Sequence, residues 1–296
     1  MSKLNSIGNR IGIIGGSGLY NLDVIENIDL KEVETPYGKP SDKIVTGEIG
    51  GANVAFLARH GTGHRLNPSE VNYRANLYAM KVLGVDKLIS STAVGSLKEN
   101  IKPTHLLIPD QYIDNTFKRE KTYFEKGIVA HVSMANPVCP FYTKIAYDTA
   151  KEIGLETHFG GTYFNMEGPQ FSSKAESESY RRADCSVIGM TQALEAKFAK
   201  ELEICFIPLA FITDYDCWHP ETEHVTAEMV VENLNKNISS GLQLIKKLIT
   251  AVNSTGSNCG CNNSLEGAVL TDLNHLQNDT LKRMRPIIEK YLKKEN

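Results

Sequence analysis

The stretch Ile204–Ile212, ICFIPLAFI, contains no charged side chain and is apolar at consecutive positions. A strand with one face in water alternates apolar and polar side chains, whereas a strand covered on both faces need not. The stretch therefore predicts a strand in the interior of a sheet that is covered on both sides, which is typical of α/β proteins.

Shorter apolar runs on either side predict more strands of this kind. They are Ile11–Ile14, Val54–Ala58, Lys87–Ser90, Leu106–Ile108 and Val187–Met190. Segments with helical spacing separate them: Ser69–Leu83, Phe141–Ile153, Lys174–Arg181, Leu194–Leu202 and Ala227–Ala251. Ser69 would cap the first of these helices. The alternation predicts an α/β fold, a single domain with a mixed β-sheet flanked by helices.

The composition divides the chain into three regions. Residues 1–251 form the expected α/β domain, residues 252–267 a polar linker with a Cys-x-Cys pattern, and residues 268–296 a helical tail. In the tail, Leu281, Met284, Ile288 and Tyr291 recur at helical spacing, so we expect this stripe to pack against the rest of the protein. Pro286 lies inside the stripe and would kink the helix or begin it.

Net charge and hydropathy argue against several classes of protein. The 296 residues carry a formal net charge of −3, which argues against nucleic acid as a partner because such proteins usually have a basic surplus. No apolar run approaches the 18 residues of a membrane-spanning helix, and the first ten residues lack the apolar stretch of a signal peptide. We expect a soluble, cytoplasmic enzyme with no membrane partner.

Polar, glycine-rich segments follow three of the predicted strands. They are Gly15-Gly16-Ser17-Gly18, Arg59-His60-Gly61 and Thr92-Ala93-Val94-Gly95-Ser96. Glycines let backbone N–H groups approach an anion, hydroxyls add donors, and an arginine can bind a phosphate bidentately. Each segment alone also fits a plain turn or a surface arginine beside a structural histidine. Together they predict a loop-built phosphate site that uses no metal.

The segment Met166–Ser173, MEGPQFSS, supplies groups suited to a sugar and a ring. Glu167 would bind a sugar hydroxyl and Phe171 an apolar ring face. Ser172 or Ser173 would cap the helix that follows.

Two interpretations fit the segment Gly189-Met190-Thr191. The methionine would pack against a sugar or ring. Alternatively, Met190 is a core residue and Thr191 a helix cap.

Two acids, Asp214 and Asp216, follow the long apolar stretch. Burial raises the pKa of a carboxyl group, and a second carboxylate raises it further. Such a group can be protonated near neutral pH and act as a general acid. The other interpretation is a solvated turn.

The cysteines and histidines show no familiar metal-binding spacing. Cys259-Gly260-Cys261 is a close pair, but a bridge between residues two apart would be strained, and zinc would need more ligands. Cys139 and Cys205 stand alone and are expected to be buried apolar residues. We therefore expect no metal and reduced thiols.

In their order along the chain, these motifs resemble the 5′-methylthioadenosine phosphorylase family, within the trimeric purine nucleoside phosphorylases. The matching stretches are IGIIGGSGLY (Ile11–Tyr20), ARHGTGH (Ala58–His64), NYRANLYAMKVLG (Asn72–Gly84), STAVGSL (Ser91–Leu97), MEGPQFSS (Met166–Ser173), GMT (Gly189–Thr191) and TDYDCW (Thr213–Trp218). The similarity runs from about Ile11 to Ile249, and the stretch Cys259–Leu265 is similar to the Cys-x-Cys tail of some archaeal members. It implies the nucleoside phosphorylase fold and a homotrimer or a dimer of trimers.

The resemblance also implies roles for individual residues. Phosphate would be held by Ser17, Arg59, His60, Thr92, Ala93 and Thr191. Met190 would line the ribose and Phe171 would stack near the base. His131 of a neighbouring subunit would approach the 5′ group, with Val230 on the local wall. Asp214 and Asp216 would face N7 and the 6-amino edge of the purine.

One short stretch of the sequence departs from the family pattern. After Gly189-Met190-Thr191 the family usually has a branched residue, then Pro and Glu, whereas this chain has Gln192-Ala193-Leu194-Glu195. The glutamate is kept and the proline is lost. The start of the following helix, or the range of substrates, would therefore differ from that of the family.

The implied reaction is phosphorolysis of 5′-methylthioadenosine to adenine and 5-methylthioribose-1-phosphate, with inorganic phosphate as co-substrate and no cofactor. Adenine is a poor leaving anion, so Asp214 would protonate N7 while Asp216 accepts from the 6-amino group. The phosphate would be both the nucleophile and the negative partner of the cationic sugar.

Three alternatives remain open at this point. A broader purine nucleoside phosphorylase would act on adenosine, inosine or guanosine, but a 6-oxopurine calls for an Asn-type donor to O6. A nucleoside hydrolase would use water and leave Arg59 without an anion. A non-catalytic nucleoside or phosphate sensor would bind without turnover.

Overall fold

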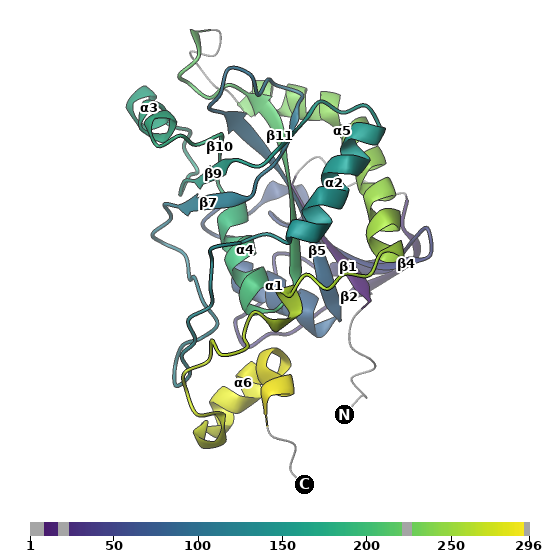
Figure 1. Ribbon diagram of the computed structural model, residues 1–296, viewed down its shortest axis with the longest axis vertical. Helices are drawn as coiled ribbons and strands as arrows, with labels where there is room; N and C mark the ends of the chain where they lie inside the picture. Colours follow the sequence, from purple (N-terminus) through teal and green to yellow (C-terminus); the bar gives the residue numbers. More distant parts are fainter. Residues whose placement is uncertain (1–8, 17–23, 221–226, 293–296) are drawn as a thin grey trace.

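A mixed β-sheet forms the centre of the protein in the computed structural model, which describes residues 9–16, 24–220 and 227–292 (Figure 1). Within the described residues the sheet has 11 strands, and its main path runs β2-β3-β4-β1-β5-β10-β9-β7. The strands are β1 Arg10–Gly15, β2 Glu26–Lys31, β3 Ile44–Ile49, β4 Ala52–Ala58, β5 Val85–Ser96, β6 Leu106–Ile108, β7 Gln111–Asp114, β8 Thr157–Phe159, β9 Thr162–Asn165, β10 Val187–Gly189 and β11 Cys205–Asp214. The expected α/β fold with a mixed sheet is confirmed.

Strand β5 is the branch point of the sheet. Its first half pairs with β1 in parallel, residues 87–95 pair with β11 in parallel, and its end pairs with β10 in the antiparallel sense. The segment Thr92–Ser96 was expected to be a loop, and that expectation is wrong because β11 pairs as far as Gly95 and extends the strand. Hydroxyl side chains and a glycine thus lie on a rigid strand rather than in a loop.

Helices cover both faces of the sheet (Figure 1). They are α1 Tyr73–Val82, α2 Pro140–Glu152, α3 Lys174–Arg182, α4 Gln192–Glu201, α5 Ala227–Ser254 and α6 Asn278–Ile288. Helices α2 and α5 pack together in one apolar core and α1 and α4 in another, so the interior strands are buried on both sides. The ten residues of β11 are all buried, as the apolar stretch predicts.

Capping residues explain where two of the predicted helices begin. Helix α1 begins later than expected because Asn72, not Ser69, caps it by accepting from the Ala75 N–H. Helix α3 begins where predicted, since Ser173 and Glu176 form a capping box.

The C-terminal segment packs onto the core formed by α1 and α4. In α6 the side chains of Met284 and Ile288 are fully buried, which confirms that the apolar stripe packs, and the helix continues through Pro286. The polar segment before α6 also contributes, because Cys261 and Leu265 are buried. None of the described helices is both long and apolar enough to cross a membrane.

Candidate active site

Polar side chains collect along the second half of β5, near the carboxyl ends of β4 and β11 and of the antiparallel strand β10. Arg59 follows β4, Thr92 lies on β5, Thr191 follows β10, and Asp214 is the last residue of β11. Carboxyl ends of strands in open α/β sheets are the usual place for ligands.

Arg59 is buried and its guanidinium faces a carboxylate. Its Nε and Nη2 bind the two oxygens of Glu195 at 2.5 and 3.1 Å, while Nη1 donates to the Ser91 carbonyl at 3.0 Å. Glu195 therefore occupies the Nε and Nη2 fork of Arg59 in this structure, and the expected role of Arg59 in binding phosphate stays a prediction. The Nη1 nitrogen, which lies nearest Gly16, is the part of Arg59 that faces the strand-end cluster.

Glu195 was not assigned a role from the sequence. It lies in the first turn of α4, is 1% exposed, and also accepts from the Ser90 hydroxyl at 2.6 Å. Gln192 on the same turn donates to the Ser90 carbonyl at 2.8 Å. The available signal was that Glu195 keeps the family position although the preceding proline is lost.

His60 is held neutral. Its Nδ1 lies 2.9 Å from the Leu66 carbonyl, which can only accept, so Nδ1 carries the proton. Burial, together with the positive charge of Arg59, lowers the pKa of His60 to about 3. In this state Nε2 is an acceptor, and its side chain can donate to a phosphate only after the imidazole takes up a proton.

Two threonines connect strand and helix at the phosphate side. Thr92 and Thr191 place their hydroxyl oxygens 3.5 Å apart. Thr191 precedes α4, but its side chain makes no capping hydrogen bond, so the cap interpretation of Thr191 is wrong. Ala93, the next residue of β5, is partly exposed. Ser17 lies outside the described residues.

Asp214 occupies a confined position opposite Gly95. A Cβ at residue 95 would lie 2.8 Å from Oδ1 of Asp214 and 3.0 Å from Ile188, so only glycine leaves room for the acid. Asp214 is 4% exposed; Thr213 donates to its Oδ2 and the Asp216 N–H to its Oδ1, both at 2.8 Å. Burial raises the pKa of Asp214 to about 6, against the Thr213 hydrogen bond and with the aid of Asp216.

Asp216 is buried beside it with a φ of 40°, in the left-handed region. Burial raises the pKa of Asp216 as well, although hydrogen bonds from Ser177 and Cys217 oppose the rise. Both predicted acids are thus buried and shifted in the direction that the sequence indicated.

Glu167 does not have the role that was expected of it. Its carboxylate accepts from the Ser69 hydroxyl, from the N–H groups of Phe117 and Lys118, and from Arg119 Nε. Burial raises the pKa of Glu167, but these donors outweigh it and hold it at about 2. Because protein donors already surround the carboxylate, Glu167 anchors the chain at residues 117–119 rather than presenting itself to a sugar.

Met190 lies against the turn at Gly168, and Phe171 belongs to the segment that lies beside the Asp216 turn. The sulfur of Met190 would be 2.5 Å from a Cβ at residue 168, so Gly168 lets the methionine lie against its turn. Phe171 is 44% exposed. Its neighbour Ser172 accepts from the Cys217 thiol through its carbonyl at 3.2 Å, which places this segment beside the Asp216 turn.

His131 is not joined to this cluster within the described part of one chain. His131 is exposed, and its N–H donates to the Ala268 carbonyl at 2.9 Å, so it lies beside the C-terminal segment. Val230 is on α5, but its side chain is outside the described part. Asn233 of the same helix donates to the Thr213 carbonyl at 2.8 Å, so the start of α5 lies next to the acids.

The positions of the cysteine thiols contradict a further expectation. Cys139 and Cys205 do not stand alone: their thiols and those of Cys259 and Cys261 all lie within 4.8 Å of one another. The argument that Cys259 and Cys261 lack further ligands is therefore wrong. This cluster is at the beginning of β11, whereas Asp214 is at its end.

Comparison with known proteins adds independent findings. A family model described as "Phosphorylase superfamily" matches residues 10–250. A curated relative from Geobacter sulfurreducens, named S-methyl-5'-thioadenosine phosphorylase, is 46% identical over 283 residues, which are 95% of this chain and 99% of the relative. A protein of the same name from Chloroflexus aurantiacus is 47% identical over 282 residues, 95% of this chain and 98% of the relative.

Solved structures agree with this. A methylthioadenosine phosphorylase from an antarctic soil metagenomic library has a TM-score of 0.90 and 44% identity, and the match covers 95% of this chain and 99% of that one. The methylthioadenosine phosphorylase of Schistosoma mansoni in complex with adenine has a TM-score of 0.84 and 30% identity, with coverage of 90% and 99%.

Proposed function

The chain belongs to the phosphorylase superfamily, and from that premise we propose that its strand-end site catalyses phosphorolysis of 5′-methylthioadenosine. The products are adenine and 5-methylthioribose-1-phosphate. The observation that carries this proposal is the pairing of Asp214 with Gly95, three residues along β5 from Thr92. Three residues of strand span roughly 10 Å, which leaves room for a ribose between a purine at the acid and a phosphate at the threonine.

The reaction exchanges one bond at C1′ of the sugar for another. The bond from C1′ to N9 of adenine breaks as an oxygen of the phosphate forms its bond to C1′. Asp214 transfers its proton to N7, becomes a carboxylate, and lets adenine leave as a neutral base. Asp216 accepts from the 6-amino group and so favours adenine over a 6-oxopurine.

On the phosphate side the fold has already oriented two hydroxyl donors, whereas neutral His60 would accept at Nε2 from a protonated phosphate oxygen. The hydroxyls of Thr92 and Thr191 meet there, and α4 begins directly after Thr191, so its N–H groups favour an anion. Arg59 adds positive charge through Nη1, and Ala93, His60 and Ser17 complete the proposed set. Inorganic phosphate is a co-substrate in this scheme, and no cofactor takes part.

We also propose that the working enzyme is a homotrimer or a dimer of trimers. Phe171 is exposed in the single chain and His131 lies away from the acids, so a second subunit is needed to bring a histidine to the 5′ side. Specific activity per chain should fall on dilution as the oligomer dissociates. A monomer that keeps full activity in sedimentation and assay at the same concentration would contradict the cross-subunit role.

A product assay tests the function. Methylthioadenosine, adenosine and inosine are each incubated with and without phosphate, and the free bases and sugar phosphates are quantified. We expect adenine release from methylthioadenosine only with phosphate, and much slower turnover of inosine. Turnover without phosphate would instead indicate a hydrolase, binding without turnover a sensor, and comparable rates on inosine a broad phosphorylase.

A further inference from the structure

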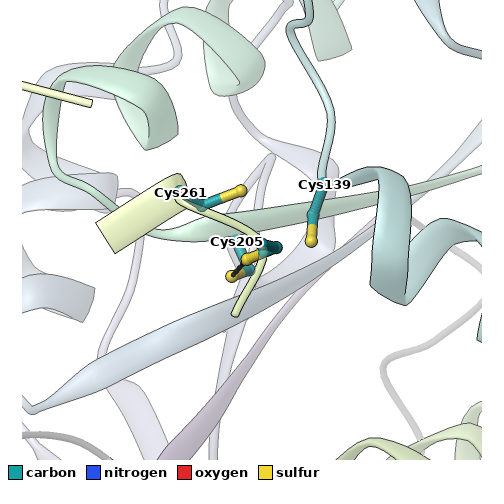
Figure 2. Close-up of side chains that lie close together, drawn as sticks. Cys139, Cys205 and Cys261 are labelled. Atoms are coloured by element: carbon teal, nitrogen blue, oxygen red, sulfur yellow. Dashed lines mark hydrogen bonds between the residues drawn. The ribbon is translucent and has the colours of Figure 1, made fainter. Parts of the chain in front are cut away.

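Four cysteine thiols from three separate segments converge at the beginning of β11. Cys139 directly precedes α2, Cys205 begins β11, and Cys259 and Cys261 belong to the segment after α5. Figure 2 shows the thiols of Cys139, Cys205 and Cys261 turned toward the same space.

The spacing of the sulfurs fits one tetrahedral ion. All four lie within 4.8 Å of one another, and Cys205 and Cys259 are 3.4 Å apart. A disulfide requires about 2.05 Å between sulfurs. Four thiolates around zinc, with Zn–S bonds of about 2.3 Å, stand about 3.8 Å apart at the corners of a tetrahedron. A cluster of several irons would hold its cysteines further apart than one ion does.

The backbone around the cluster is arranged to hold these positions. The Cys139 N–H donates to the Phe206 carbonyl at 2.9 Å, which ties the start of α2 to β11 beside Cys205. Gly260, with a φ of 74°, reverses the chain between Cys259 and Cys261 so that both thiols reach the same space. The N-terminus of α2 also favours a thiolate at Cys139.

Burial separates this cluster from ordinary surface thiols. Cys139 is fully buried, and Cys205 and Cys261 are 8% and 6% exposed. Their surroundings are the apolar core between α2, α5 and β11. A closed set of four thiolates without an open position is the form of a structural zinc site, not of a catalytic one.

We propose that Cys139, Cys205, Cys259 and Cys261 bind a structural zinc ion that fastens the C-terminal segment to α2 and β11. On binding, the four thiols release their protons and act as thiolates. The site is roughly 30 Å of strand away from Asp214, because nine steps of β11 separate them. The ion therefore stabilises the fold and takes no part in the chemistry. The Cys-x-Cys spacing is shorter than the usual two to four residues, and the turn at Gly260 accounts for it.

Metal analysis of the untagged, desalted full-length protein tests this proposal. We expect one zinc per chain by mass spectrometry of the metal, and release of that zinc when an organomercurial titrates the thiols. Cys259→Ser and Cys261→Ser should lose most of the zinc and lower Tm by several degrees, with little change in turnover at low temperature. Cys185→Ser is the matched control, since Cys185 is a buried cysteine outside the cluster, and it should keep one zinc.

Two results would overturn the site. One is an intact mass of the unreduced protein that is lower by the hydrogens lost in disulfides among these four residues. The other is six titratable thiols in the unfolded wild-type protein with no bound metal after expression in zinc-supplemented medium. Both measurements use the wild-type chain, so they decide the question even if a serine variant fails to fold.

Discussion

The carboxyl group of Asp214 is subject to opposing influences within a few ångströms. Burial disfavours its charged form, while the Thr213 hydroxyl and the Asp216 N–H favour it. The resulting pKa of about 6 keeps a usable fraction of the group protonated at neutral pH. An acid with an ordinary pKa would hold almost no proton to transfer there.

Asp214→Asn keeps the shape of the side chain but removes the transferable proton. Turnover of methylthioadenosine should fall by about 10²–10⁴, the usual contribution of a general acid. Phosphate affinity should stay nearly unchanged, and turnover of inosine should suffer far less, because Asn can donate to O6. Steady-state kinetics with both nucleosides measure the difference. A loss below about threefold on methylthioadenosine would point to Asp216 as the acid.

Comparison with Asp214→Asn also shows how the ionisation of Asp214 contributes to the pH dependence of kcat/KM. In the parent, kcat/KM for methylthioadenosine should fall as pH rises through about 6, because Asp214 must be protonated in the free enzyme. Phosphate ionises in a similar range, so the profile of Asp214→Asn serves as the reference. If the two profiles have the same shape, Asp214 is not the group that titrates.

Gly95→Ala tests the space opposite the acid. The new Cβ would approach Asp214 Oδ1 to 2.8 Å and Ile188 to 3.0 Å, so the acid must move. A shift of this kind should lower kcat by tenfold or more, about the loss expected when a catalytic group is misplaced by part of an ångström. Gly256→Ala is the control, since nothing lies within 4 Å of a Cβ there. Equal kinetics for both variants would show that residue 95 does not confine the acid.

At the level of elements, the beginning of α4 organises the phosphate side. Thr191 leaves its hydroxyl uncommitted to capping, and Glu195 in the first turn binds the fork of Arg59. A negative charge beside a phosphate site weakens phosphate binding by repulsion, and it also keeps a buried arginine compensated when phosphate is away.

Glu195→Gln removes that charge. Leaving Arg59 buried without its partner should lower stability by about 3–5 kcal/mol. Phosphate should then raise the Tm of the variant more than that of the parent, since it supplies the missing charge. Thermal scans across phosphate concentrations measure both effects.

Glu201→Gln is a matched control on the same helix. Glu201 is also buried, but it accepts from the Thr122 hydroxyl and the Tyr123 N–H, each at 2.7 Å, and not from Arg59. Glu201→Gln should be less stable than the parent, but phosphate should raise its Tm no more than it raises the Tm of the parent. The same phosphate effect in both variants would contradict the role assigned to Glu195.

Two of the features that sequence analysis missed have no apolar signature. Strand β2, Glu26–Lys31, is exposed at every position and, among the described strands, pairs only with β3, so the residues ENIDLK give no buried face to detect. The extension of β5 through Thr92–Ser96 was missed because hydroxyl residues and glycine suggest a loop. Pairing with β11, more than a hundred residues later, overrides that local preference.

For the whole molecule, the raised pKa of Asp214 has a cost in stability. The folded protein holds this proton more tightly than an unfolded chain with a pKa of 3.8, so stability falls as pH rises from about 4 to 6 and stays lower above it. Asp214→Asn lacks this dependence. The stability difference in favour of the variant should grow by up to about 3 kcal/mol between pH 4 and pH 8. Denaturant unfolding at both pH values measures it; a constant difference would mean that Asp214 is not shifted.

Contacts between distant parts of the chain set the limit of what the sequence revealed. The strand-end residues were found because motifs follow apolar runs, and the burial of Asp214 was predictable from the stretch before it. The partner of Arg59 lies 136 residues away, and folding brings Cys139, before α2, to Cys259 in the segment after α5. The two residues of each pair are too far apart in the sequence to form a recognisable motif. Only the assembled fold brings them together.

The order in which β5 receives its neighbours has a consequence for synthesis. The ribosome completes β5 at Ser96 with β1 already made, but β11 ends only at Asp214. That is roughly 120 residues later, or roughly 6–24 s at the usual elongation rate. During this interval the nascent chain carries one edge of its central strand unpaired. Translation speed between these two points, and chaperones that bind open strand edges, therefore govern how much of the chain reaches the folded enzyme.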